Sequence, residues 1–127
     1  MAGRIRVSTS VSWSNENVSV SMTASDTYTQ AGTEAIGNNQ IIGASSEAVN
    51  LGDVTTLGYL GFKNLNAVGG STIHIGTTNP VTAGNAQISL PPQAAVFVPI
   101  GTAAAGNAWY AISSSGNSNL FVLAIEA

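Results

Sequence analysis

The residue of this chain best suited to chemistry is its single histidine, His74. A Ser-His-acid triad would join it to a serine and to an acid such as Asp53, but the sequence contains no Gly-x-Ser-x-Gly turn to present the serine. The alternation of residues 71–76 places His74 on the opposite side of a strand from Ile73 and Ile75. We therefore expect a histidine on the polar side of a strand, and a single histidine cannot form a His-rich metal site.

The acidic residues are isolated from one another along the sequence. They are Glu16, Asp26, Glu34, Glu47, Asp53 and Glu126, without the clustering of a calcium-binding loop. A glycosidase needs only two carboxylates, but its cleft is usually lined by acids and aromatics, and this chain is poor in both. Asp53 follows a Leu-Gly pair, so we expect its side chain to cap the backbone of a turn. Cysteine is absent, which excludes thiolate sites. We expect no catalytic residue, metal or cofactor.

Charged residues make up only 7% of the 127 residues, with three Lys or Arg against six Asp or Glu. Arg4, Arg6 and Lys63 are too few to form a basic surface along a phosphate backbone, so we expect no nucleic-acid binding. A surface rich in Ser, Thr and Asn can instead hydrogen-bond another protein without burying ions. Arg4 and Arg6 share one side of the expected first strand, where they either protect its edge from aggregation or dock on an acidic partner.

Three aromatic residues, Trp13, Trp109 and Tyr110, are further candidates for binding. They could form a platform on which a sugar stacks, but the chain is only 6% aromatic, and we interpret them as anchors of the core or of a protein interface. The longest apolar tract, residues 94–100, is too short to span a bilayer and contains Pro99. The N-terminus has no continuous apolar stretch typical of a signal peptide, so we expect no membrane partner.

Alternating polar and apolar residues, interrupted by frequent glycines, predict an all-β protein. Residues 4–13 alternate, and a Ser14-Asn15 turn leads to a second alternating run from Val18, so residues 1–30 predict an N-terminal hairpin or arm. Further strands are expected at residues 40–42, 47–51, 57–63, 72–75, 86–90, 94–99, 109–113 and 119–126. Eight to ten short strands predict a single domain, residues 1–127, built as an antiparallel sandwich or barrel.

Two of the expected strands are apolar on both sides. In residues 119–126, Phe121 and Leu123 lie on one side of the strand, and apolar residues also occupy the other side. In residues 94–100, Val96 lies on one side and the apolar Phe97 lies on the other. One side of such a strand faces the core, and the other needs a loop or another subunit to cover it. With 127 residues available, we expect a symmetric homo-oligomer, with Val96, Phe121 and Leu123 among its interaction residues.

Residues 47–66 contain a Leu-Gly-Asp turn that leads into an apolar strand ending in Lys-Asn-Leu. The chain then runs in order through Ile73–Gly76, residues 88–91, Ala95–Pro99, Tyr110–Ser113 and residues 120–126. This pattern, which covers about residues 33–127, resembles small structural proteins of tailed bacteriophages. The resemblance carries no catalytic residue.

The resemblance implies a jelly-roll head protein of the decoration, or cement, type. Such a protein would sit on the outer surface of the capsid, bind the major capsid protein and stabilise the assembled shell, often as a homotrimer. The alternative that we keep open is a carbohydrate- or receptor-binding jelly-roll module of a phage fibre or head appendage. A small hydrolase is a distant third possibility, because no clustered acid and base accompany His74.

Overall fold

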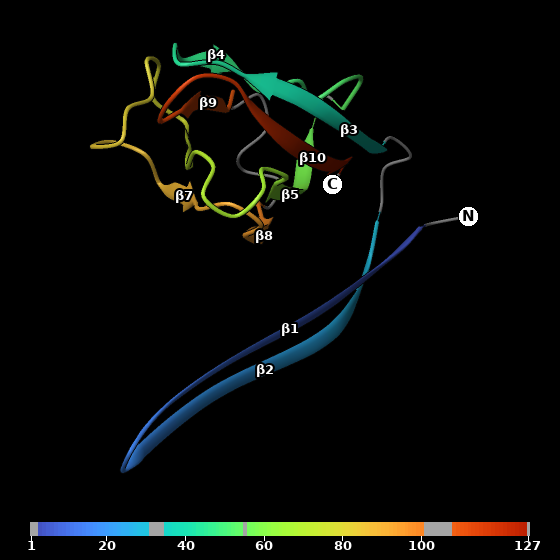
Figure 1. Ribbon diagram of the computed structural model, residues 1–127. Coiled ribbons are helices and arrows are strands. Elements are labelled where there is room, and N and C mark those ends of the chain that lie inside the picture. Colours follow the sequence, from blue (N-terminus) through green and yellow to red (C-terminus); the bar gives the residue numbers. More distant parts are fainter. Residues whose placement is uncertain (1–2, 31–34, 55, 101–107, 127) are drawn as a thin grey trace. The chain divides into compact units, whose positions relative to one another are not determined.

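The computed structural model describes residues 3–30, 35–54, 56–100 and 108–126, and within these ranges the chain forms ten strands and no helix (Figure 1). The strands are β1 (Arg4–Asn15), β2 (Val18–Thr29), β3 (Ala35–Ile42), β4 (Glu47–Ala48), β5 (Leu57–Asn64), β6 (Ile73–Gly76), β7 (Ile88–Leu90), β8 (Ala95–Pro99), β9 (Tyr110–Ser113) and β10 (Ser118–Glu126). The predicted all-β class is therefore confirmed. In the part of the chain described, there is no helix of the length and apolarity that crossing a membrane requires.

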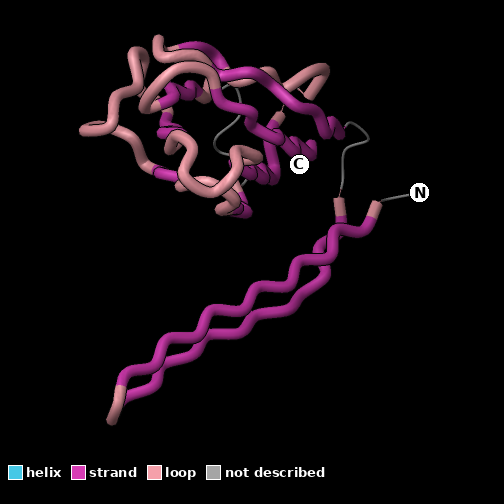
Figure 2. The backbone as a smooth tube through the Cα atoms, in the orientation of Figure 1, coloured by secondary structure: helices cyan, strands magenta, loops and turns pink. Residues whose placement is uncertain are grey.

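The chain divides into two compact units, Met1–Thr33 and Glu34–Ala127. The first unit contains the predicted N-terminal hairpin, in which β1 and β2 pair antiparallel from Arg4 opposite Thr29 to Asn15 opposite Val18 (Figure 2). At the turn, Asn15 Oδ1 accepts a hydrogen bond from the backbone N–H of Glu16 at 2.7 Å. Polar and apolar residues alternate along most of each twelve-residue strand, and this period of two fits a β-ribbon with two chemically different sides.

The second unit is a sandwich of two four-stranded sheets, confirming the predicted antiparallel architecture. The first sheet has the order β3-β10-β5-β8 and the second has the order β4-β9-β6-β7. Neighbouring strands in both sheets pair antiparallel. The core between the sheets contains Ile42, Val49, Val54, Leu57, Leu60, Phe62, Ile73, Ile75, Leu90, Trp109, Ala111, Leu120, Val122 and Ala124. Burial of these side chains provides the hydrophobic stabilisation of the unit.

The largest differences from the expected strand lengths are in β3 and β4. β3 begins at Ala35 rather than at residue 40, because its polar positions find backbone partners in β10. β4 is only two residues long, although a strand was expected over residues 47–51. After β4, Val49 N–H still donates to the Trp109 carbonyl oxygen at 2.8 Å, and Asn50 N–H donates instead to the side-chain oxygen of Gln40 at 2.8 Å.

Candidate functional site

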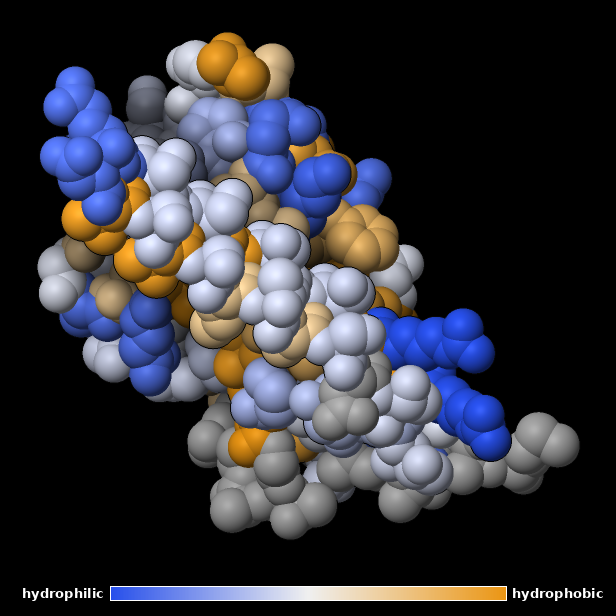
Figure 3. All heavy atoms as spheres, turned by 90° about the horizontal axis from the view of Figure 1, so that it is seen from below, coloured by the Kyte–Doolittle hydropathy of each residue, from blue (hydrophilic) through white to orange (hydrophobic). Residues whose placement is uncertain are grey.

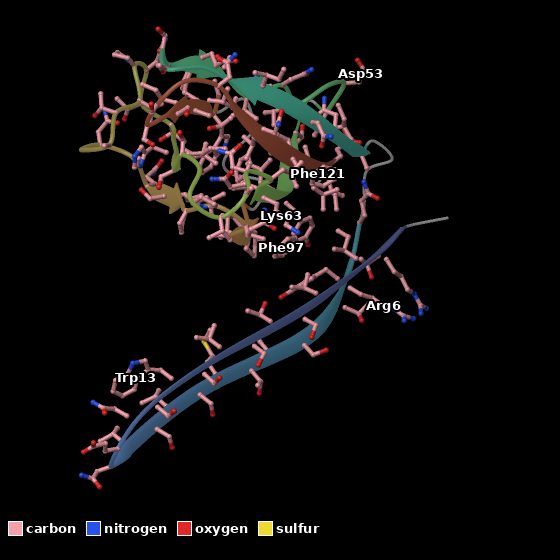
Figure 4. The ribbon with its side chains drawn as sticks, viewed as in Figure 1. Arg6, Trp13, Asp53, Lys63, Phe97 and Phe121 are labelled. Carbon is pink, nitrogen blue, oxygen red and sulfur yellow. The ribbon has the colours of Figure 1, made fainter. Side chains whose placement is uncertain are left out.

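The outer side of the first sheet is the candidate site in the second unit. Along β10, Leu120 and Val122 are fully buried in the core, whereas Phe121 and Leu123 alternate with them and are only half-buried. The prediction that this strand is apolar on both sides is thereby confirmed. Figure 4 shows Phe121 together with Phe97 of β8 and Lys63 of β5. We call Tyr59, Lys63, Phe97, Phe121 and Leu123 the outer sheet face.

Glycines on the neighbouring strands allow these side chains to lie flat against the sheet. A Cβ atom at Gly37 of β3 would lie 3.3 Å from Cζ of Phe121. A Cβ atom at Gly61 of β5 would lie 3.3 Å from Cβ of Leu123. Both distances are shorter than ordinary van der Waals contacts, so any larger residue would lift Phe121 or Leu123 away from the backbone. Phe121 and Leu123 therefore lie close to the backbone of the neighbouring strands.

The edge of the outer sheet face is aromatic. Tyr59 and Phe97 stack with their ring centroids 5.8 Å apart and their planes at 15°. Lys63 is exposed and lies in register with Phe121, so a cation stands beside the apolar centre. The alternation of β5 places Tyr59 and Lys63 on the same side as Gly61. Neither residue was among the predicted interaction residues, although the alternation that groups them is present in the sequence.

Two of the predicted interaction residues lie elsewhere. Val96 packs against the core, and the residue of β8 on the outer side is Phe97, so the assignment of Val96 to the surface is corrected. Trp109 is 7% exposed and contacts Phe62 in the core, with ring centroids 6.1 Å apart. Its Nε1 donates to no partner among the described residues. Trp109 is therefore a core anchor, one of the two roles expected for it.

Tyr110, the next residue, is half-buried and alternates with Ala111, which is fully buried in the core. Its position puts it on the outer side of the second sheet, where His74 also lies. His74 Nδ1 and Ser89 Oγ are 2.8 Å apart, on paired positions of β6 and β7. The described residues contain no group of three or more His, Cys, Asp or Glu side chains that could hold a metal ion.

The turn that contains Asp53 is capped by a different residue. Asn50 Oδ1 accepts a hydrogen bond from Gly52 N–H at 2.9 Å, and Gly52 has a φ of 59°. Asn50 therefore caps the turn before Asp53, and the Asp53 side chain is exposed. A cap from Asp53 to the N–H two residues later would involve Thr55, which lies outside the described residues. An amide two residues before the bonded N–H forms the usual Asx-turn, which explains why Asn50 has the better geometry.

The hairpin of the first unit carries a second surface. Its register places Trp13 opposite Val20 and Val11 opposite Met22, so these side chains share one side of the ribbon. All four are more than half exposed, as is Val18 nearer the turn. We call Val11, Trp13, Val18, Val20 and Met22 the hairpin apolar patch.

The opposite side of the ribbon is polar. Arg4 pairs with Thr29 and Arg6 pairs with Thr27, and the following pairs on this side join serines and threonines as far as Ser14 opposite Ser19. The expectation that Arg4 and Arg6 share a side is confirmed, and both are exposed. In Figure 3, pale residues of intermediate hydropathy cover much of the visible face, in keeping with a surface rich in hydroxyl groups and poor in charge.

Comparisons of the chain with protein-family models, with curated proteins and with solved structures found no match.

Proposed function

We propose that this protein is a non-enzymatic structural protein of a virion, a decoration or cement protein that binds the outer surface of an assembled capsid and stabilises it. The observation that carries this proposal is the outer sheet face. It groups the apolar Phe97, Phe121 and Leu123 with Tyr59 and Lys63 on one side of the first sheet, and the core occupies the other side of that sheet. Such a surface suits a flat protein partner, here the major capsid protein, better than it suits a small substrate.

The strand order supports a jelly-roll assignment. The eight strands from β3 to β10 fall into two four-stranded antiparallel sheets, with β10 between β3 and β5 in one sheet and β9 between β4 and β6 in the other. Two interleaved four-stranded sheets of this kind are the arrangement of double-sheet jelly rolls, a fold common in viral capsid proteins. Fold by itself does not give function, so the assignment adds to the surface argument without replacing it.

The low charge of the chain supports attachment through many weak contacts. Because only 7% of the residues are charged, most polar contacts would be hydrogen bonds of Ser, Thr and Asn, made directly or through water. Few charged groups would then lose their hydration when the protein binds. A homo-oligomer, with three copies as the resemblance implies, repeats each contact. After the first contact forms, the others are effectively intramolecular, so the summed attachment becomes strong.

A thermal-release assay tests the cement role. Particles carrying the protein and particles lacking it are heated, and release of packaged nucleic acid is followed. We expect both to assemble and the particles lacking the protein to rupture at a lower temperature, because a ligand stabilises the state that it binds. Co-sedimentation of the protein with intact particles is the companion measurement. Equal rupture temperatures together with no co-sedimentation would contradict the proposal.

The alternative is a carbohydrate- or receptor-binding module, and exposed aromatic residues favour it. Trp13 is 56% exposed, and the Tyr59–Phe97 stack lies on the outer sheet face. Aromatic faces of this kind can stack on sugar rings. Binding of host-surface glycans that is lost in both Trp13→Ala and Phe97→Ala, with unchanged rupture temperature of the particles, would favour this alternative over the cement role.

A further inference from the structure

The hairpin apolar patch has no partner in the described part of its own unit. Its five side chains are between 53% and 60% exposed, and they form two cross-strand pairs near the turn plus Val18. The sheet that carries them consists of β1 and β2 alone. A two-stranded ribbon is marginally stable in water at best and needs further strands or a packing partner for its apolar side. The folded hairpin therefore requires a covering surface.

We propose that this covering surface is the hairpin apolar patch of further copies of the same chain. The patch of a second copy matches the first in length, in strand spacing and in chemistry, because every side chain in it is uncharged and large. A copy of the chain is also present wherever the chain folds, whereas a capsid is not. This inference deepens the proposed function by assigning a contact between copies, and the free protein tests it without a capsid.

The area of the patch is close to what a contact between two copies needs. Five large apolar side chains that are each more than half exposed present about 500 Å² per copy, a size typical of interaction sites. Two patches would bury about 1,000 Å² together, which is about the smallest total area of a specific interface. The patch of one further copy is therefore large enough to cover the first.

The polar side of the same ribbon fixes the orientation of this contact. Ser12 pairs with Ser21 and Ser10 pairs with Thr23 on the side opposite the patch. Burying this ladder of hydroxyl groups against an apolar surface would leave them without water and without partners, which is costly. In the assembly the serine and threonine side consequently faces solvent, and the hairpin apolar patch faces the axis.

Single cysteines test the contact directly, since the chain has none of its own. Val20→Cys places a thiol in the patch, and Ser21→Cys, the matched control, places it one residue away on the polar side. Both variants are treated with a short bis-maleimide at micromolar protein concentration and separated on a denaturing gel. We expect at least tenfold more covalent dimer from Val20→Cys. Equal cross-linking of the two variants would overturn the proposal.

Equilibrium sedimentation of the unmodified full chain completes the test. We expect a multiple of the 12.8 kDa chain mass, and we expect Val20→Glu, but not Ser21→Glu, to reduce the average mass severalfold. Far-UV circular dichroism of both variants checks that the sandwich remains folded. A single-chain mass for the unmodified protein would overturn the inference. If the cross-linking and sedimentation results are as expected but the protein does not bind capsids, the contact between copies is supported and only the cement role is rejected.

Discussion

Asn64 of β5 and Leu90 of β7 join the two sheets of the sandwich by a hydrogen bond. The Asn64 side-chain Nδ2 donates to the Leu90 carbonyl oxygen at 2.8 Å and to the Ser71 carbonyl oxygen at 2.9 Å, and its Oδ1 accepts from Asn66 N–H at 3.0 Å. The residue is fully buried. All three hydrogen bonds are to backbone groups, so this one side chain supplies partners for two carbonyl oxygens and one N–H at the edge of the core.

We expect Asn64→Leu to lower the free energy of unfolding by about 3 kcal/mol, because it leaves backbone groups without partners in or near the core. Urea denaturation followed by far-UV circular dichroism measures the loss. Asn119→Leu is the control, since Asn119 is exposed on neighbouring β10 and should change stability by less than about 0.5 kcal/mol. Equal effects of the two substitutions would contradict the structural role of Asn64.

Gly52→Ala should destabilise the turn before β5 for two separable reasons. Gly52 has a φ of 59°, which costs a residue with a side chain about 1–2 kcal/mol, and an added Cβ would overlap Cδ1 of Ile36. Gly116 has a φ of 61° with open space around it, so Gly116→Ala isolates the backbone cost. We expect thermal unfolding to show the larger decrease in midpoint for Gly52→Ala, and the reverse order would contradict the contact with Ile36.

Neighbouring residues of β10 should respond differently to a charge. Leu120 is fully buried, so we expect Leu120→Asp to unfold the second unit. Phe121 lies on the outer sheet face, so we expect Phe121→Asp to stay folded by circular dichroism but to weaken binding to particles at least tenfold. Co-sedimentation with particles measures this binding. Undiminished binding of a folded Phe121→Asp variant would exclude the outer sheet face as the surface that contacts the capsid.

Replacing Arg4 and Arg6 by Ser should weaken attachment to particles most at low salt. The two guanidinium groups lie on one side of the hairpin, and their attraction to an acidic partner is screened least at low salt. Co-sedimentation with particles at about 0.02 M and about 0.3 M salt measures the effect. Ser8→Ala, on the same side of β1, keeps both charges and serves as the control. A loss that is independent of salt would argue against electrostatic docking.

Trp109→Phe should be far less destabilising than Trp109→Ala. The indole packs on Phe62, but its Nε1 has no hydrogen-bond partner among the described residues, so phenylalanine keeps most of the packing and gives up no such bond. We expect losses of about 1 kcal/mol for Phe and about 3–5 kcal/mol for Ala, measured by urea denaturation. Similar losses for both would indicate that Nε1 does have an important partner.

Alternation in the sequence was sufficient to predict the elements. A side-chain period of two does not depend on which strand lies alongside, so the hairpin, the positions of most strands and the shared side of Arg4 and Arg6 could be predicted. Strand ends were less predictable. Residues 35–39 carry a glycine and two asparagines, which disfavour strands locally, and they are strand because β10 supplies their backbone partners.

The candidate surfaces depended more heavily on tertiary structure. Where both sides of a strand are apolar, the sequence contains no information on which side faces the core, so Val96 was assigned to the surface that Phe97 in fact occupies. Likewise, nothing in their local sequences separates the exposed Trp13 from the buried Trp109. Trp109 is buried because the second unit itself contains two sheets, which enclose a core between them.

The all-β class, the amphipathic hairpin and the low charge of the chain therefore follow from residue type and local spacing. The pairing of distant strands and the hydrogen bond from Asn64 to Leu90 depend instead on the tertiary structure. So does the grouping on one face of Tyr59, Lys63, Phe97, Phe121 and Leu123. Long-range strand order sets which residues become neighbours, and residue spacing along the chain does not encode that order.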